Sequence, residues 1–245
     1  MNICGLMKTT LLDFPGQVAC TVFTGGCNFR CPFCHNSDLL EFGLPSDYTE
    51  EDIFEFLKKR RHTLDGVAIT GGEPTLQPDL PEFIKKVRGL GLKVKLDTNG
   101  INPKMVNELV SEGLLDYVAM DIKASPENYA KVCGFDLNGC ADESIWPHIF
   151  GKLTETKNFL MKGHVPYEFR TTVVDGLHTE EDFHGIAAFI EGADKYFLQC
   201  YKDSGNILDQ EAGFSEPKVP TLIKYRDIVA PHVKFADIRG VDIEL

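Results

Sequence analysis

Residues 25–36 read GGCNFRCPFCHN and place three cysteines, Cys27, Cys31 and Cys34, within eight residues. The segment follows residues 18–24, an apolar stretch rich in β-branched and aromatic side chains that is predicted to be a strand. In α/β proteins, chemistry gathers at the carboxyl ends of the parallel strands. The three cysteines are therefore predicted to lie at the mouth of a sheet.

Four kinds of site compete for these cysteines. A buried group of structural thiols is disfavoured by the glycine-rich, polar segment around them. A structural zinc ion needs four ligands, and His35 directly follows Cys34, which makes shared tetrahedral ligation awkward. Covalent haem attachment fits residues 31–35 but leaves Cys27 unexplained. An iron–sulfur cluster held by three thiolates is favoured, because its remaining iron stays open for another ligand.

Composition excludes several function classes. The 245 residues carry a net charge of −12, which argues against a nucleic-acid surface. The densest basic run, residues 58–61, ends a predicted helix, where cations suit the dipole. No run approaches the length of a membrane span, and the first residues do not read as a signal peptide, so we expect a cytoplasmic protein without a membrane partner. Eight cysteines in such a protein favour metal ligands or free thiols over disulfides.

Short apolar runs alternate with amphipathic ones along the chain. The predicted strands are residues 18–24, 67–70, 92–97, 117–121, 167–174 and 196–201, with a further one at 233–238. The predicted helices are residues 50–61, 80–90, 103–111, 145–161, 180–190 and 220–229, with capping boxes at Thr49 and Asp52 and at Thr179 and Asp182. This alternation predicts one α/β domain, residues 1–245, with a mainly parallel sheet. Six strands are too few for a closed eight-stranded barrel, so we expect an open, partial (β/α)6 barrel.

Polar residues stand where these strands end. Gly71, Gly72 and Glu73 follow the second strand, Asp97 and Thr98 the third, and Asp121 and Lys123 the fourth, while Arg170 lies inside the fifth. Glycines at a strand end expose backbone groups to a ligand, although an ordinary turn before Pro74 explains them equally well. Asp121 and Lys123 also fit a surface ion pair, and Arg170 fits a structural salt bridge.

Taken together, these motifs resemble those of the radical S-adenosylmethionine (SAM) superfamily. The three cysteines have the spacing of its signature, with an aromatic residue, Phe33, before the last one. The resemblance implies a [4Fe–4S] cluster on Cys27, Cys31 and Cys34, whose open iron binds the amino and carboxylate groups of SAM. It also implies that SAM is cleaved to a 5′-deoxyadenosyl radical.

The same resemblance assigns the remaining candidate residues. It implies that Gly71, Gly72 and Glu73 meet the SAM amino group, and that Asp97, Thr98 and Asp121 frame a monovalent cation. Lys123 is expected to face the SAM carboxylate, and Arg170 to lie near SAM. The residues expected to line the cluster and SAM are Phe33, His35 and Asn36. Asn36 is expected to hydrogen-bond a cluster sulfur.

Within the superfamily, residues 11–16, 26–36 and 169–173 look most like the longer form of the anaerobic ribonucleoside-triphosphate reductase activating proteins. Such activases abstract hydrogen from a glycine of a glycyl radical enzyme, and a flavodoxin- or ferredoxin-type protein supplies their electron. The rivals are activation of another glycyl radical enzyme of the pyruvate formate-lyase type, a small-molecule radical SAM reaction as in deazapurine biosynthesis, and a non-catalytic metal-binding module.

This sequence departs from the activase pattern in three places. Phe14 replaces a glycine of the Asp-Gly-Pro-Gly segment, and Tyr201 and Lys202 stand where some activases carry a histidine that contacts the adenosyl group. Residues 36–71 contain no cysteine, so we expect a single cluster. Cys133 and Cys140 are expected to be loop thiols.

Overall fold

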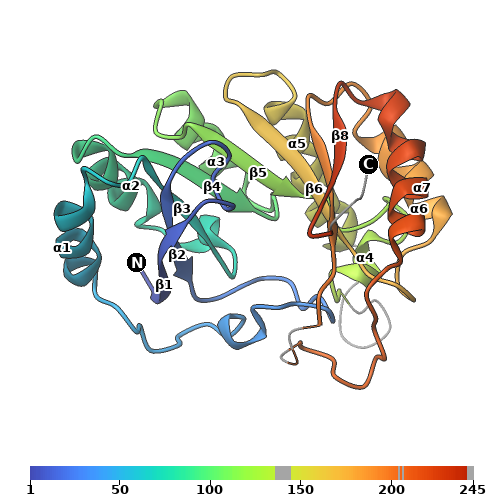
Figure 1. Ribbon diagram of the computed structural model, residues 1–245, viewed down its shortest axis with the longest axis horizontal. Coiled ribbons are helices and arrows are strands. Elements are labelled where there is room, and N and C mark those ends of the chain that lie inside the picture. The colour runs from blue at the N-terminus through green and yellow to red at the C-terminus, as the bar shows by residue number, and fades with distance from the viewer. Residues whose placement is uncertain (136–144, 204, 206, 242–245) are drawn as a thin grey trace. The chain divides into compact units, whose positions relative to one another are not determined.

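The computed structural model describes residues 1–135, 145–203, 205 and 207–241 of the chain. Within these residues, eight strands form one open sheet in chain order, as Figure 1 shows. The strands are β1 (Ile3–Thr10), β2 (Ala19–Thr24), β3 (Gly66–Gly71), β4 (Lys93–Thr98), β5 (Tyr117–Asp121), β6 (Tyr167–Val173), β7 (Tyr196–Cys200) and β8 (Ala236–Arg239). The fold class is therefore α/β with an unclosed, mainly parallel sheet, as the sequence predicts.

Helices connect the parallel strands. They are α1 (Glu50–Arg60), α2 (Leu80–Gly89), α3 (Pro103–Ser111), α4 (Tyr129–Val132), α5 (Ile145–Leu160), α6 (Glu180–Phe189) and α7 (Val219–Val229), and short 3-10 turns lie at Ser37–Leu39, Pro74–Leu76 and Ala230–His232. Both predicted capping boxes are present: Thr49 and Asp52 begin α1, and Thr179 and Asp182 begin α6. In the described part of the chain, no helix has the length and apolar character that crossing a membrane requires.

Two elements are absent from the sequence-based prediction. Strand β1 runs antiparallel to β2, with Ile3 opposite Thr24 and Thr10 opposite Ala19. Most side chains of β1 are partly or fully exposed. Its residues therefore show no alternation of apolar and polar side chains from which a strand could be predicted. Helix α4 is a single turn, too short to show a helical period.

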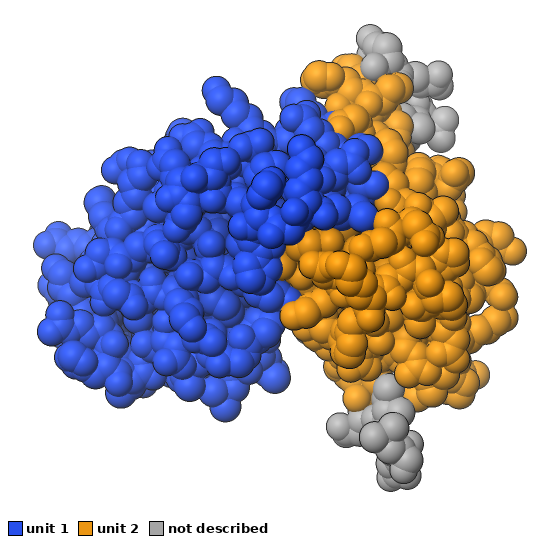
Figure 2. All heavy atoms as spheres, turned by 90° about the horizontal axis from the view of Figure 1, so that it is seen from above, with its two compact units in different colours: residues 1–28, 38–119, 152–166 blue, residues 29–37, 120–151, 167–245 orange. Residues whose placement is uncertain are grey.

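The chain divides into two compact units, coloured separately in Figure 2. Unit 1 comprises residues 1–28, 38–119 and 152–166. Its central strands β3 and β4 follow β2 in parallel and are almost completely buried. Helix α2 packs on β4, and its residues Phe83 and Ile84 are fully buried. The carboxyl ends of β2, β3 and β4 carry the residues that the sequence singles out in this unit.

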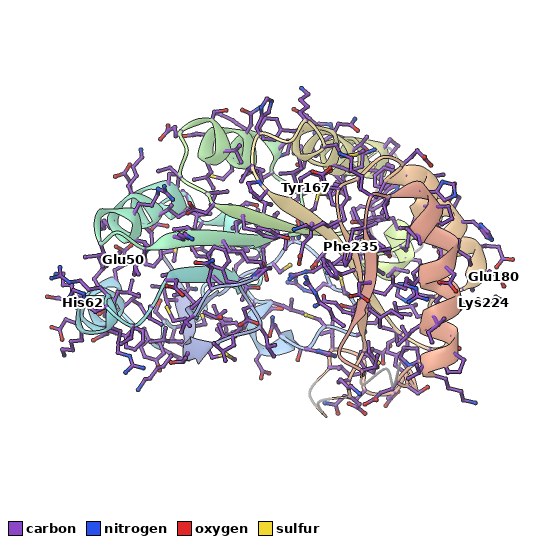
Figure 3. The ribbon with its side chains drawn as sticks, turned by 45° about the horizontal axis from the view of Figure 1, so that its top comes forward. Glu50, His62, Tyr167, Glu180, Lys224 and Phe235 are labelled. Atoms are coloured by element: carbon purple, nitrogen blue, oxygen red, sulfur yellow. The ribbon has the colours of Figure 1, made fainter. Side chains whose placement is uncertain are left out.

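Unit 2 comprises residues 29–37, 120–151 and 167–245. Its strands β6, β7 and β8 are parallel neighbours, and α7 packs against both α6 and β8 (Figure 1). Between the two helices, the rings of Phe183 and Tyr225 stack with their centroids 4.2 Å apart. Lys224 and Glu180 form an ion pair on the exposed side of the same helices, where Figure 3 labels them. The prediction of one domain for the whole chain stays a prediction.

A buried ion pair attaches β8 to β6. Arg239 donates two parallel hydrogen bonds, of 2.7 and 2.8 Å, to the carboxylate of Glu168, whose side chain is completely buried. The guanidinium also lies 3.3 Å from the ring centroid of Phe197 on the strand between them. The pair therefore gives each oxygen of the buried Glu168 carboxylate a charge-assisted hydrogen bond.

We predict that Arg239→Ala lowers the free energy of unfolding by about 3 kcal/mol or more, since it removes two charge-assisted hydrogen bonds from a buried carboxylate. The matched control is Lys234→Ala, which breaks an exposed pair with Asp194 and should cost less than about 1 kcal/mol. Urea denaturation measures both. The double variant Glu168→Gln/Arg239→Ala should recover part of the loss, and equal costs for the two single variants would contradict the prediction.

Candidate functional site

The first strand-end feature of unit 1 is a close backbone contact between the segment before Cys27 and the glycines after β3. The amides of Gly72 and Glu73 each donate a 2.8 Å hydrogen bond, to the carbonyls of Thr24 and Gly26 respectively. A Cβ on Gly72 would lie 2.2 Å from the Gly26 oxygen, so only glycine allows this approach. These two amides are therefore engaged within the protein, and the glycines serve close packing as well as any ligand contact.

Glu73 joins the ends of β3 and β4. Its fully buried carboxylate accepts hydrogen bonds from the Thr75 amide (3.0 Å) and hydroxyl (2.5 Å), the Thr98 hydroxyl (2.7 Å) and the Asn99 amide (2.6 Å). Burial raises the pKa of Glu73, and these four donors oppose that shift. Glu73 thus fixes the strand ends, and its predicted contact with SAM stays a prediction.

A buried lysine stands beside the predicted site at the end of β4. The Lys95 ammonium pairs with the carboxylate of Asp97, two residues further along the strand. The two side chains are 2% and 11% exposed. The hydroxyl of Thr98, the next residue, donates a hydrogen bond to Glu73 and accepts a 3.0 Å hydrogen bond from the Gly100 amide. The sequence-based site omits Lys95. Its pairing with Asp97 depends on both side chains lying on the same buried face of β4, which the sequence alone does not show.

Cys27 lies just after β2 in unit 1 and is 7% exposed. Its amide donates to the Leu40 carbonyl at 3.0 Å, which fixes the backbone at this ligand position. The side-chain amide of Asn99 donates to Asn28 at 2.9 Å and lies 4.0 Å from the Cys27 sulfur. The sequence-based site omits Asn99, although it directly follows Thr98.

In unit 2, Cys31 and Cys34 lie in one turn. The Cys34 amide donates to the Cys31 carbonyl at 3.0 Å, and Phe33 between them is buried. Burial raises the pKa of the Cys34 thiol, while the backbone amide of Asn36 and the charge of Lys123 act in the opposite direction. Asn36 therefore does approach a predicted ligand sulfur, through its backbone.

His35 contacts the residue after the end of β7. Its ring centroid lies 5.1 Å from that of Tyr201, which directly follows the strand. Burial lowers the pKa of His35, so the neutral ring is favoured. The structure thus connects the cysteine turn with the residue that stands where some activases carry a histidine.

Three of the predicted SAM residues meet in unit 2. Arg170 Nε donates to one oxygen of Asp121 at 2.6 Å, and Lys123 Nζ donates to the other at 2.7 Å. Burial alone would raise the pKa of Asp121, but the two cations hold it well below its usual range. For Lys123, burial opposes the charged form, and Asp121 together with Cys31 raises its pKa overall. Asp121 is therefore shared between two cations.

His178 supports this group of charges and was not expected from the sequence. The Val174 amide donates to its Nδ1 at 3.1 Å, so Nε2 carries the proton and donates to the Lys123 carbonyl at 2.9 Å. Its ring also meets that of Phe33 edge-on, with centroids 6.2 Å apart. Burial lowers the pKa of His178, which keeps the ring neutral. His178 therefore positions both Lys123 and the cysteine turn.

The donor set fits an iron–sulfur cluster by its chemistry. Within the described residues, no three side chains of His, Cys, Asp or Glu are grouped to hold a single metal ion. A [4Fe–4S] cluster binds each thiolate at a different iron, so its ligands need not converge on one point. Thiolates are the soft ligands that such clusters select, and an amide hydrogen bond to a ligand sulfur tunes them.

A family model described as the radical SAM superfamily matches residues 21–139. A protein of Methanocaldococcus jannaschii, named as a glycyl-radical enzyme activating enzyme, is 30% identical over 246 residues, which is 98% of this chain and 96% of that protein. The chain belongs to the radical SAM superfamily. It is therefore an enzyme, and the family implies a [4Fe–4S] cluster and SAM as its cofactors.

Two further comparisons support this radical SAM assignment. A pyruvate formate-lyase-activating enzyme of Listeria monocytogenes is 33% identical over 133 residues, which is 49% of this chain and 53% of that enzyme. The structure of Streptococcus suis SuiB bound to S-adenosylmethionine matches with a TM-score of 0.64 and 13% identity, over 88% of this chain and 48% of SuiB. The second likeness shows the open radical SAM fold.

The other cysteines of this radical SAM enzyme have separate environments. Cys4 is partly exposed, whereas Cys20, Cys133 and Cys200 are buried, and Cys140 lies outside the described residues. Burial raises the pKa of Cys20 to about 12, which keeps its thiol protonated. Cys133 is fully buried in the turn after α4, where its carbonyl accepts a 3.0 Å hydrogen bond from the Arg30 amide.

Gly134 sets how closely this turn approaches the cysteine segment. It has a φ of +71°, and a Cβ there would lie 1.9 Å from the Arg30 oxygen. We predict that Gly134→Ala displaces the backbone that leads into Cys31. Iron content after anaerobic reconstitution should fall, and the electron paramagnetic resonance (EPR) signal of the reduced cluster should change.

Gly163→Ala is the matched control, because Gly163 has a φ of +74° and its Cβ would meet no atom within 4 Å. Both variants pay about 1–2 kcal/mol for the left-handed backbone, and only Gly134→Ala adds the clash. Equal iron content and identical spectra in the two variants would show that the close contact is unimportant.

Proposed function

We propose that this radical SAM enzyme activates a glycyl radical enzyme by abstracting hydrogen from one of that partner's glycine residues. The observation that carries the SAM site is the group formed by Asp121, Lys123 and Arg170, in the same unit as Cys31 and Cys34. The activating role is supported by the similarity over almost the whole chain to a protein named for that role.

Cys27, Cys31 and Cys34 are proposed to hold the cluster. When bound, the [4Fe–4S] cluster supplies the electron that cleaves SAM to a 5′-deoxyadenosyl radical. Phe33 packs inside the cysteine turn, the Asn36 amide donates to the Cys34 sulfur, and His35 lies against Tyr201. These contacts fix the segment before any ligand arrives, which lowers the cost of binding.

The two cations around Asp121 suit an anionic ligand. Asp121 is shared by Lys123 and Arg170, and Lys123 is the cation that we propose to face the ligand. A carboxylate such as that of SAM completes the pairing with charge-assisted hydrogen bonds. The SAM amino group instead needs carbonyl acceptors, which the backbone at Gly71 and Gly72 is proposed to supply. Glu73 acts there as a positioning residue.

The partner is proposed to be an anaerobic ribonucleoside-triphosphate reductase, with a flavodoxin- or ferredoxin-type electron donor. The motifs at residues 11–16, 26–36 and 169–173 support this choice. A pyruvate formate-lyase type of partner is the second candidate, because a pyruvate formate-lyase-activating enzyme aligns with half of the chain. The net charge of −12 disfavours nucleic acid as the partner.

We predict that Lys123→Met raises the Kd for SAM by about tenfold or more, because a charge-assisted contact to the carboxylate is lost. Arg170 still pairs with Asp121 in this variant, so the fold should persist. Anaerobic binding titration of the reconstituted enzyme measures the effect. Lys224→Met, which removes an exposed lysine paired with Glu180, is the control and should bind SAM normally. Loss of stability with unchanged SAM affinity would assign Lys123 to the fold alone.

The activase proposal predicts a glycyl radical on the partner. Reduced enzyme, SAM and the candidate anaerobic reductase are mixed anaerobically, and EPR should record a doublet that disappears when the partner's radical glycine is replaced by alanine. A doublet on a pyruvate formate-lyase instead would reassign the partner. With robust SAM cleavage, no doublet on any glycyl radical enzyme would overturn the activase role and favour a small-molecule substrate.

A further inference from the structure

The proposed function gives no role to Lys95, which pairs with the predicted site residue Asp97. Both residues lie on the same face of β4, since side chains two residues apart along a strand point the same way. Lys95 is among the largest fully buried side chains of the described residues. Burying an ammonium is costly unless it is paired, so a lysine in the middle of this buried strand calls for a reason beyond packing.

The contacts at this strand end do not fit the monovalent cation that the family resemblance implies. That ion would need oxygen ligands from Asp97, Thr98 and Asp121. The Asp97 carboxylate pairs with the Lys95 ammonium. The Thr98 hydroxyl donates a hydrogen bond to Glu73 and accepts one from the Gly100 amide. Within unit 2, Asp121 is held by two cations of its own.

We propose that the Lys95 ammonium replaces the monovalent cation beside Asp97, so that this enzyme binds SAM without Na⁺ or K⁺. The inference rests on the proposed SAM site. A lysine ammonium is a compact point charge with three donors, comparable in charge to an alkali cation. Because it is attached to the strand, it is present at any salt composition. Lys95 acts on SAM through Asp97, and it is a positioning residue.

The first test uses the wild-type, cluster-loaded enzyme. The Kd for SAM is measured in chloride salts of Na⁺, K⁺ and tetramethylammonium at equal ionic strength, so that screening is constant. Tetramethylammonium is too bulky to take the place of the small ions. The three values should agree within about twofold, as expected when only screening acts. Clearly tighter binding in Na⁺ or K⁺ would overturn the proposal.

The second test removes the lysine. Lys95→Met should weaken SAM binding about tenfold or more in tetramethylammonium, because Asp97 is left without its cation, and Na⁺ or K⁺ should restore it. Lys93→Met is the matched control, since Lys93 lies on the same strand with its ammonium 3.0 Å from the Gln17 side chain on the surface. Binding by Lys95→Met that is normal in all salts, or weak in all salts, would contradict the proposal.

A third measurement separates this proposal from the SAM site itself. Thermal unfolding of the cluster-free protein is followed in the same salts, without SAM. Na⁺ and K⁺ should raise the Tm of Lys95→Met relative to tetramethylammonium and leave that of the wild type unchanged. A variant that stays unfolded or equally destabilised in every salt assigns Lys95 to the fold alone. If the wild type fails to bind SAM, the proposed function fails, and the Tm shifts still decide the role of Lys95.

Discussion

A buried carboxylate at a strand end needs hydrogen-bond donors or cations from the protein itself. The arrangement of the candidate site depends on this constraint. An unpaired charge inside a sheet costs several kcal/mol, so each carboxylate recruits partners that then become fixed. Glu73 takes four neutral donors, Asp97 takes one lysine, and Asp121 takes an arginine and a lysine. The three carboxylates thus differ in the charge of the partners that each recruits.

The charge pattern follows directly from these pairings. In unit 1, Lys95 and Asp97 form a pair of opposite charges, and Glu73 accepts hydrogen bonds from neutral donors while burial raises its pKa. In unit 2, Asp121 is shared by Lys123 and Arg170. The neutral His178 donates to the Lys123 carbonyl and so fixes the backbone that carries this lysine. A fixed backbone there supports the proposed contact between Lys123 and the SAM carboxylate.

The sequence predicts those parts of the fold that are encoded locally. Strand and helix positions and both capping boxes follow from residue patterns within a few positions, and the structure confirms them. Strand β1 was missed, because its pairing with β2 is the main reason that it is a strand. Lys95 and His178 were missed for a similar physical reason. Their roles depend on burial and on partners such as the Lys123 carbonyl, 55 residues away in sequence from His178.

The backbone before two of the cysteines is held by contacts that the motif alone does not show. The Gly26 carbonyl accepts the Glu73 amide, and a Cβ on Gly72 would clash with the same carbonyl. Four residues later, Arg30 is bonded to Cys133 and closely approached by Gly134. The first anchor, within unit 1, thus immediately precedes Cys27, and the second, within unit 2, immediately precedes Cys31. Each fixes the backbone on which a predicted ligand of the cluster stands, so these contacts hold two of the three cysteines independently of any ligand.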